Sequence, residues 1–425
     1  MVEAMEKITA VKGMPDILPE QITMWQHLEL VIRQLMRVYS VSEIRTPLLE
    51  RTQLFKRSIG EVTDIVEKEM FTFADQNSDS LTLRPEGTAS CVRACIEHSL
   101  FRNQQQHKLW YMGPMYRYER PQKGRYRQFY QLGVEAYNFP GPDIDAEQIA
   151  LCARLWQQLG ISSMLSLQIN SLGNNQSRSL YKQKLIEYFT AHKEQLDEDS
   201  KRRLTSNPLR LLDSKNPELQ QLINQAPVLI DYIDPESKQH FLALQQQLTL
   251  LDIKFTVNTR LVRGLDYYNR TVYEWVTDKL GAQAAVCAGG RYDNLVTTLN
   301  GPETAAVGFA LGLERVLLLL EIAQQKIENS IDGYLICTGE RAIEQRLKIA
   351  EQLRNLLPNF SLSTCLGAGS FAALFKKADK SGAKVALIVG DDELANGTIG
   401  VKFLRIEKPQ LTISMEEVTT VLGDI

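Results

Sequence analysis

The chain of 425 residues is poor in cysteine and histidine and contains no long apolar run. Its six cysteines are too few for a disulfide framework, and Cys91 and Cys95 stand four apart, unlike the CxxC spacing of zinc or redox sites. The five histidines form no HExxH motif, so the sequence predicts buried thiols and no metal site built by protein groups alone. The N-terminus lacks a basic segment followed by an apolar stretch, and VLLLLEIA after Arg315 is too short to span a membrane. We therefore expect a cytoplasmic protein without membrane contact.

Two common nucleotide-binding signatures are also missing. Neither GxGxxG nor GxxxxGK[ST] occurs, which excludes a Rossmann dinucleotide site and a P-loop as the source of any nucleotide chemistry. The net charge of -3 argues against a surface covered in basic groups, although the local cluster Arg120, Lys123, Arg125 and Arg127 can meet phosphates. With 44% hydrophobic residues, the chain can form two or three domains with cores of their own.

Residues 109–137 read as two strands joined by the basic loop RPQKGRY. Side chains alternate across a strand, so Arg117, Phe129, Gln131 and Glu135 fall on the more polar face of this hairpin. A half-buried hairpin turns such a face to solvent or to a ligand. A solvated basic tip would explain the charges, but an aromatic ring between an anion-binding arginine and polar groups favours a binding site.

A second candidate site lies where a strand is expected to meet a helix. Residues 70–83 resemble a hairpin, Pro85 stops its last strand, and Gly87 and Thr88 open the helical pattern CVRACIEHSLF. Glu86 and Thr88 therefore sit at a corner where side chains can converge on a ligand. Thr88 as a helix cap, with Glu86 favouring the helix dipole, explains the pair equally well.

The remaining elements alternate in character along the chain. Residues 21–39 read as an amphipathic helix, residues 45–60 as a turn and a strand entering the core, and Asp145 as the cap of another helix. Residues 174–252 read as a helical insertion. In AAVGFALGLERVLLLL, Gly308 and Gly312 stand four apart with Arg315 further along a helix, a pattern typical of close packing on a sheet.

The candidate segments described above carry charged groups of both signs. Arg117, Arg263 and Arg315 directed at one cleft suit a highly charged anion such as a triphosphate. Glu86, Glu119 and Glu135 beside them suit an ammonium group, an imidazole or a magnesium ion. An amino acid that meets ATP would use both sets.

These residues lie in segments that closely resemble the histidyl-tRNA synthetase family of class II aminoacyl-tRNA synthetases, in its bacterial form. TPLLERTQLFKRSIGE resembles the first class II motif, MYRYERPQKGRYRQF the second and GFALGLER the third. LVRGLDYYNR and AGGRYD resemble two peptides peculiar to the histidine enzymes, and they are far more specific than the class II motifs. The resemblance extends along nearly the whole chain.

The resemblance implies an architecture and an activity. Residues 1–327 would form an α+β catalytic core on an antiparallel sheet, with the insertion at 174–252, and residues 328–425 a C-terminal α/β anticodon-binding domain. The family activates L-histidine with ATP to histidyl-adenylate and pyrophosphate, then transfers histidine to the 3′ end of tRNA(His). It also implies a homodimer through the first motif, and Mg2+ accompanying ATP near Glu119.

The resemblance further implies a role for each candidate residue. Glu86 and Thr88 would hold the α-amino group of histidine and Gln131 its carboxylate, while Glu135 and Tyr268, beside Tyr267, would read the imidazole. Arg117 and Arg263 would grip the α-phosphate, Phe129 would stack under adenine, and Arg125 and Arg315 would bind the outer phosphates. Tyr130 and Asn294 depart from the family's usual residues, and alternation places Tyr130 on the apolar face.

Two other functions remain open. A non-catalytic histidine-binding regulatory paralogue would resemble the core, but such proteins lack the C-terminal domain and lose part of the arginine set. An amino-acid adenylating enzyme that does not use tRNA is disfavoured by the same domain. No protein base for the transfer step stands out, so a phosphate oxygen of the adenylate is the expected acceptor of the proton.

Overall fold

The computed structural model describes residues 7–423, apart from 61–62, 207, 213, 215, 263, 264, 266, 282–283, 326–330 and 368. The chain forms two compact units, Met1–Gln325 and Lys326–Ile425, and each has buried clusters of its own. The predicted boundary between residues 327 and 328 lies outside the described residues and stays a prediction. No described helix is both long enough and apolar enough to cross a membrane.

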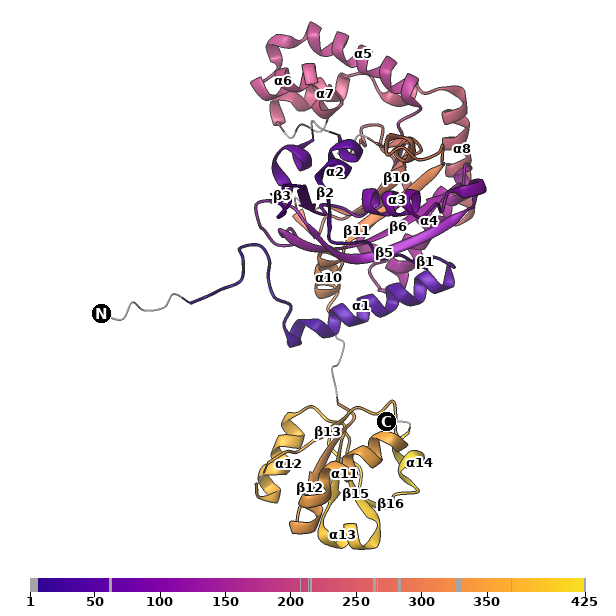
Figure 1. The fold of residues 1–425 in the computed structure, drawn as a ribbon. Coiled ribbons are helices and arrows are strands. Elements are labelled where there is room, and N and C mark those ends of the chain that lie inside the picture. The colour runs from indigo at the N-terminus through magenta and orange to yellow at the C-terminus, as the bar shows by residue number, and fades with distance from the viewer. Residues whose placement is uncertain are drawn as a thin grey trace, which may run out of the picture. The chain divides into compact units, whose positions relative to one another are not determined.

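The first unit is built on an eight-stranded sheet whose central pairs are antiparallel and whose two outermost pairs are parallel (Figure 1). Its strands, in spatial order, are β1 (Ser42–Glu43), β5 (His107–Tyr116), β6 (Gln128–Tyr137), β11 (Ala306–Gly312), β10 (Ala285–Arg291), β9 (Asn269–Val276), β7 (Ser166–Ser171) and β8 (Phe255–Val257). This is the antiparallel core that the sequence predicts.

Both faces of this sheet are covered. Trp110, Leu132 and Val134 pack into one large cluster, which also takes buried side chains from α1 (Pro19–Val38), α4 (Pro142–Gln158), α8 (Pro235–Leu250) and α10 (Leu313–Ile322). Tyr111 and Met115 pack into a second cluster with α3 (Thr88–Glu97) and α5 (Asn175–Ala191). The predicted alternation is therefore correct, but the second face of the β5–β6 hairpin is largely buried rather than solvated.

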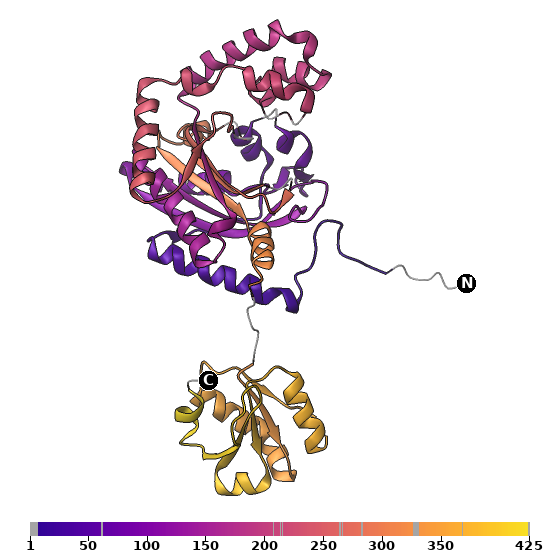
Figure 2. The same cartoon turned by 180° about the vertical axis from the view of Figure 1, so that it is seen from behind.

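The helical insertion is confirmed, and it ends in α8, which packs back against the sheet unit. It contains α5, α6 (Glu198–Ser206), α7 (Gln220–Gln225) and α8. Figures 1 and 2 show α5, α6 and α7 at one end of the first unit and α1 at the other.

Two predictions about which segments are strands and which are helices are wrong. Residues 45–60 form only the short strand β2 (Leu49–Arg51), and then α2 (Thr52–Ile59), because Leu54, Phe55 and Ile59 share a helical face that is buried. β2 joins β4 (Ser80–Leu83) and β3 (Phe71–Ala74), the predicted hairpin, in a small separate sheet. Gly308 and Gly312 lie on strand β11, and the helix begins only at Leu313.

Asp145 is not the cap of α4, as the sequence suggested. The residue before the helix is Gly141, and the Asp145 carboxylate is fully buried. It accepts hydrogen bonds from His240 Nε2 of α8 at 2.8 Å and from Arg291 Nη1 of β10 at 3.2 Å. One side chain thus connects α4, the end of the insertion and a central strand.

The second unit is a five-stranded mixed sheet with helices of its own, in agreement with the predicted α/β fold. Its strands, in spatial order, are β13 (Leu362–Thr364), β12 (Gly333–Cys337), β14 (Val385–Val389), β15 (Thr398–Phe403) and β16 (Leu411–Ser414). Its helices are α11 (Glu340–Leu356), α12 (Phe371–Lys380), α13 (Asp391–Asn396) and α14 (Val418–Leu422).

Candidate active site

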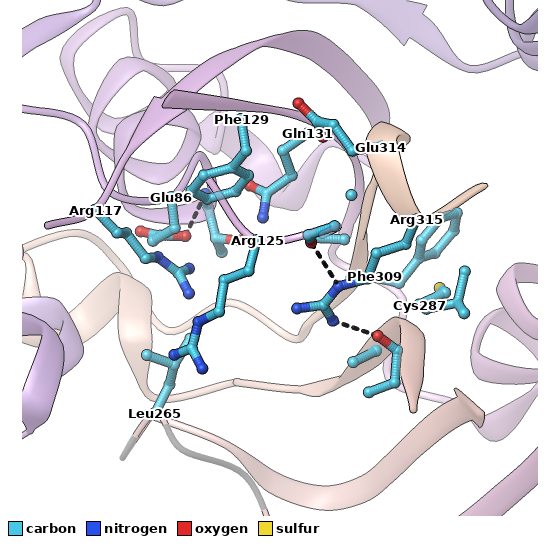
Figure 3. A pocket seen from close by; sticks show the side chains of 18 of the residues that line it. Glu86, Arg117, Arg125, Phe129, Gln131, Leu265, Cys287, Phe309, Glu314 and Arg315 are labelled. Atoms are coloured by element: carbon cyan, nitrogen blue, oxygen red, sulfur yellow. Dashed lines mark hydrogen bonds between the residues drawn. The ribbon is translucent and has the colours of Figure 1, made fainter. Parts of the chain in front are cut away.

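A cavity of about 210 Å³ opens beside β6, β10 and β11 of the first unit (Figure 3). Of the residues predicted from the sequence, its lining includes Glu86, Thr88, Arg117, Glu119, Arg125, Phe129, Gln131, Tyr267, Tyr268 and Arg315. Glu135 lies behind the lining, and Arg263 is outside the described residues. Segments up to 229 positions apart (86 to 315) are thereby brought to one space.

Three arginines form a cationic wall of this cavity. Arg117 donates from Nε to the Pro85 carbonyl at 2.9 Å, and its guanidinium lies 5.3 Å from the centre of the Phe129 ring. Arg125 pairs with Glu119, and Arg315 donates to the carbonyl of Ala285. Figure 3 shows the three guanidinium groups close to one another.

The proximity of these cations has an electrostatic consequence. Burial lowers the pKa of Arg315, and repulsion from Arg117 and Arg125 lowers it further. Like charges in a partly desolvated site repel strongly, so a bound polyanion would relieve the repulsion. Planar guanidinium groups also match phosphate oxygens in geometry. The wall is therefore suited to a di- or triphosphate.

The cavity also presents acidic and amide groups, and Figure 3 shows Glu86 beside Arg117. The Glu86 carboxylate accepts from the backbone N–H of Thr88 at 2.7 Å and of Ala89 at 2.9 Å, so it caps the start of α3. Burial raises the pKa of Glu86 although these amides and Arg117 oppose the shift. Thr88 is thus the first residue of α3 and not its cap, contrary to one prediction from the sequence, and Glu86 accepts from the free amides instead. Glu86 also lines the cavity, where a bound ammonium group would offset its burial.

Gln131 offers a hydrogen-bonding atom to the same space. Its side chain is buried, and its Oε1 finds no partner among the described residues. A buried acceptor without a donor is costly, so a ligand donor is favoured there. As placed, the amide oxygen suits the ammonium group of an amino acid better than the carboxylate to which the sequence assigned Gln131.

Glu135 is fixed by hydroxyl groups directly behind the cavity. Thr88 Oγ1 donates to it at 2.8 Å, Tyr111 at 2.9 Å, and Tyr292 donates to its other oxygen. Burial raises the pKa of Glu135 to about 8 although these donors favour the anion. A Cβ on Gly308 would lie 1.7 Å from Glu135 Oε2, so only glycine leaves room for this carboxylate.

Aromatic rings border the carboxylate and the cavity together. The ring centroids of Tyr267 and Tyr268 are 4.7 Å apart, and Tyr292 meets Tyr267 edge-on at 5.6 Å. Tyr130, in contrast, packs against the first cluster, with its ring edge-on to Trp25, as the alternation predicts. Tyr267, Tyr268 and Tyr292 line the cavity, and we call their rings the tyrosine slot. Such rings beside Glu135 fit an aromatic ligand with a polar edge, such as imidazole.

Sequence reasoning missed several residues of the site. Tyr111 shares the strand parity of Arg117, and Tyr292 lies within AGGRYD, so both signals were available. Glu314 lines the cavity and accepts from the backbone N–H of Tyr130 at 2.8 Å, and burial raises its pKa to about 7. Its contact joins residues 184 positions apart, which no local pattern indicates.

The described residues contain no group of three or more His, Cys, Asp or Glu side chains that could hold a metal ion. Glu119, beside which Mg2+ is expected to accompany ATP, is paired with Arg125 and lies 4.0 Å from Arg117. A cation at this carboxylate would therefore have to displace Arg125, which phosphate oxygens would attract in turn.

Comparison with known proteins agrees with this geometry. The family described as histidyl-tRNA synthetase matches residues 13–316, and the anticodon binding domain family matches residues 332–425. The structure of apo histidyl-tRNA synthetase from S. aureus is 35% identical, with coverage of 98% of this chain and 100% of that chain and a TM-score of 0.82.

More distant structures share the fold. Histidyl-tRNA synthetase from Nostoc sp. PCC 7120 is 18% identical over 98% of this chain and 99% of its own, with a TM-score of 0.71. An ATP phosphoribosyltransferase regulatory subunit/histidyl-tRNA synthetase from Bacillus halodurans C is 22% identical over 90% and 98%, with a TM-score of 0.60. The predicted class II fold, with its C-terminal anticodon-binding domain, is thus confirmed, and the chain belongs to the histidyl-tRNA synthetase family.

Proposed function

We propose that this chain is a histidine–tRNA ligase, which activates L-histidine with ATP and transfers it to tRNA(His). The observation that carries the proposal is the polarity of one cavity. Three arginines line it, and Glu86, Gln131 and the tyrosines beside Glu135 line it as well. An amino acid and a nucleoside triphosphate need these two environments side by side.

The first step would be in-line attack of the histidine carboxylate on the α-phosphorus. Arg117 lies beside Glu86, since its Nε donates to the Pro85 carbonyl and its charge opposes the rise that burial causes in the pKa of Glu86. That position favours contact with the α-phosphate, while Arg125 and Arg315 would bind the outer phosphates. The reaction needs positioning and charge neutralisation more than covalent help from the protein.

Recognition of histidine would use the buried carboxylate and the tyrosine slot. Glu86, Thr88 and Gln131 would hold the ammonium group, and Glu135 would accept an imidazole N–H while Tyr268 meets the other ring nitrogen. Thr88 belongs to both sets, because its hydroxyl donates to Glu135. The residues that would bind the ammonium group and those that would bind the imidazole are therefore connected in one hydrogen-bonded network.

The transfer step would pass the acyl group to the terminal ribose of tRNA(His), with a phosphate oxygen of the adenylate accepting the proton. The C-terminal unit would bind the anticodon, and the protein would work in the cytoplasm as a homodimer with ATP and Mg2+. These partners follow from the family and from the anticodon-binding domain.

Histidine-dependent exchange of labelled pyrophosphate into ATP tests the activation step, and charging of tRNA(His) tests the transfer. We expect both, with no exchange when another amino acid replaces histidine. Histidine binding without exchange would instead favour the regulatory paralogue. Exchange without charging would favour an adenylating enzyme that does not use tRNA.

A further inference from the structure

The segment before α1 makes a contact that the proposed reaction does not yet use. Residues 7–17 form an extended arm (Figure 1), and its side chains are exposed except at Gly13, Met14 and Ile17, which are partly buried. Ile17 packs against the first hydrophobic cluster and so fastens the arm beside α1. Gly13 reaches a different place, the loop of residues 117–127 between β5 and β6.

The contact is made by the backbone. The Gly13 carbonyl accepts hydrogen bonds from the N–H of Arg127 at 2.8 Å and of Gln128 at 3.3 Å, where the loop re-enters the sheet. Gly13 has φ of +84°, and a Cβ there would lie 2.8 Å from Pro121 Cγ and 3.0 Å from Arg127 Cγ. The position therefore requires glycine both for its conformation and for the close approach.

This anchor is connected to the cationic wall. Arg127 donates from Nε to the Glu119 carbonyl at 3.2 Å, and its guanidinium lies 3.7 Å from the centre of the Tyr118 ring. The Glu119 carboxylate in turn pairs with Arg125 inside the cavity. Gly13 is thus connected to Arg125 through two residues. Arg127 is bonded directly to the arm, and Glu119 lines the cavity.

Within the loop, Arg117 N–H donates to the Arg127 carbonyl at 2.9 Å, and Gln122 and Arg125 exchange backbone hydrogen bonds. Contacts from outside the loop are Tyr118 N–H to the Glu69 carbonyl at 2.6 Å and Arg315 Nε, which lies 3.5 Å from the Gly124 carbonyl near the tip. On the returning side, the Gly13 carbonyl adds an anchor from outside the hairpin at Arg127 and Gln128. A loop that carries cations for a triphosphate gains affinity when its conformation is set before the ligand arrives.

We propose that the arm is a positioning element for the triphosphate of ATP, with the Gly13 carbonyl fixing the 117–127 loop so that Arg125 and Glu119 face the cavity. This inference rests on the proposed function, since it concerns the same ATP site. Gly13 is a positioning residue and does not itself touch the substrate.

Gly13→Ala tests the inference, with Gly382→Ala as the matched control. Gly382 has φ of +81°, but nothing lies within 4 Å of its Cβ position, and it belongs to the second unit. Both changes impose similar backbone strain, and only the first pushes on the loop. Loss of the two shared hydrogen bonds should raise the KM for ATP about tenfold in Gly13→Ala, while the KM for histidine stays within about twofold.

A steric rescue separates positioning from general damage. Pro121→Ala removes the Cγ atom that a side chain at position 13 would meet, so Gly13→Ala/Pro121→Ala should recover part of the ATP affinity, while Pro121→Ala alone changes little. Equal rises in the KM for ATP and for histidine in Gly13→Ala would overturn the inference.

A measurement that does not depend on activity distinguishes this inference from the proposed function. Hydrogen–deuterium exchange in residues 117–128 should accelerate in Gly13→Ala and remain at the parent rate in Gly382→Ala. Unchanged exchange would overturn the positioning role even in an active enzyme. A parent chain without histidine-dependent pyrophosphate exchange would instead refute the proposed function.

Discussion

Glu135 combines deep burial with hydroxyl donors on both carboxylate oxygens. Such an arrangement fixes the carboxylate in one orientation at the edge of the tyrosine slot. Gly308 leaves the space that this carboxylate occupies, since a Cβ there would lie 1.7 Å from Glu135 Oε2. A ring with an N–H at the matching position is then favoured over rings that lack one.

Glu135→Gln is therefore expected to weaken histidine recognition. Burial raises the pKa of Glu135 to about 8, and a bound imidazole N–H would favour its charged form. The change keeps the volume but removes that charge-assisted hydrogen bond, worth roughly 1.5–3 kcal/mol, so the KM for histidine should rise by about ten- to a hundredfold. The KM for ATP, measured in the same pyrophosphate exchange assay, should stay near the parent value. An unchanged histidine KM would move Glu135 out of the recognition site.

Arg263→Ala tests the catalytic cation outside the described residues. If Arg263 stabilises the charge at the α-phosphate, adenylate formation should slow by roughly a hundredfold or more, with normal melting temperature and histidine binding. Arg263→Lys should recover only part of the rate, because an ammonium group cannot reproduce the planar fork. A surface role predicts a change of stability within about 0.5 kcal/mol and no loss of rate.

For single residues, the sequence predicted site membership well where side chains alternate between the two faces of a strand. Arg117, Phe129 and Gln131 were placed on one face by alternation, and all three line the cavity. Asp145 was misread as a cap because its partners, His240 and Arg291, are distant in sequence. Alternation assigns each residue of a strand to one face of the sheet. The partners in a buried ion pair, however, come from distant segments that only the tertiary fold brings together.

Among the elements, α4, α8 and β10 are joined by the buried Asp145 carboxylate. Asp145 and the side chain of Arg291 are fully buried and form an ion pair at 3.2 Å, with His240 also bonded to Asp145. Arg291 is followed in the chain by Tyr292, which donates to Glu135. The end of the insertion is therefore connected to the strand that carries one wall of the recognition site.

Asp145→Asn should lower the free energy of unfolding by about 3–5 kcal/mol, because it removes the carboxylate nearest to the buried Arg291 charge and leaves, among the described residues, only Asp293, at 3.8 Å. Asp143→Asn is the matched control: Asp143 lies in the same first turn but is exposed, so its loss should cost at most about 1 kcal/mol. Denaturant unfolding of the two variants provides the comparison. Equal stabilities would show that the buried pair is dispensable.

The same pair predicts a dependence on pH. Burial alone would raise the pKa of Asp145, but Arg291 and His240 outweigh it and hold the pKa below its usual range. A pKa depressed in the folded state contributes stability above the unfolded-state pKa, and that contribution disappears as the pH falls through the folded value. The stability difference between parent and Asp145→Asn should therefore narrow below about pH 4.

Helices and strands were harder to predict where the spacing of residues in the sequence suggests one and the neighbouring elements favour the other. The segment GFALGL has glycines at helical spacing, yet it pairs with β6 and β10 as a central strand. Residues 52–59 were read as extended because Pro47 and apolar neighbours precede them, although Leu54, Phe55 and Ile59 lie on one helical face. Short apolar segments fit either period, and neighbouring elements decide between them.

At the scale of the whole molecule, each buried cluster of described residues lies within one of the two units. A chain ending at Gln325 should therefore fold and keep histidine-dependent pyrophosphate exchange, since every residue assigned to the chemistry precedes that point. Charging of tRNA(His) should fall severely through loss of anticodon contacts. Undiminished charging by the shortened chain would contradict the role given to the second unit.

The six cysteines are all free and buried, so their labelling can be used to detect unfolding of the structure around them. Cys91, Cys95, Cys152 and Cys287 belong to the first unit, and Cys337 and Cys365 to the second. An alkylating reagent reaches a buried thiol only when the surrounding structure opens, and the peptide that carries the label identifies the unit that opened. The order in which the two units unfold under heat or denaturant can thus be followed in the unaltered chain, without an engineered probe.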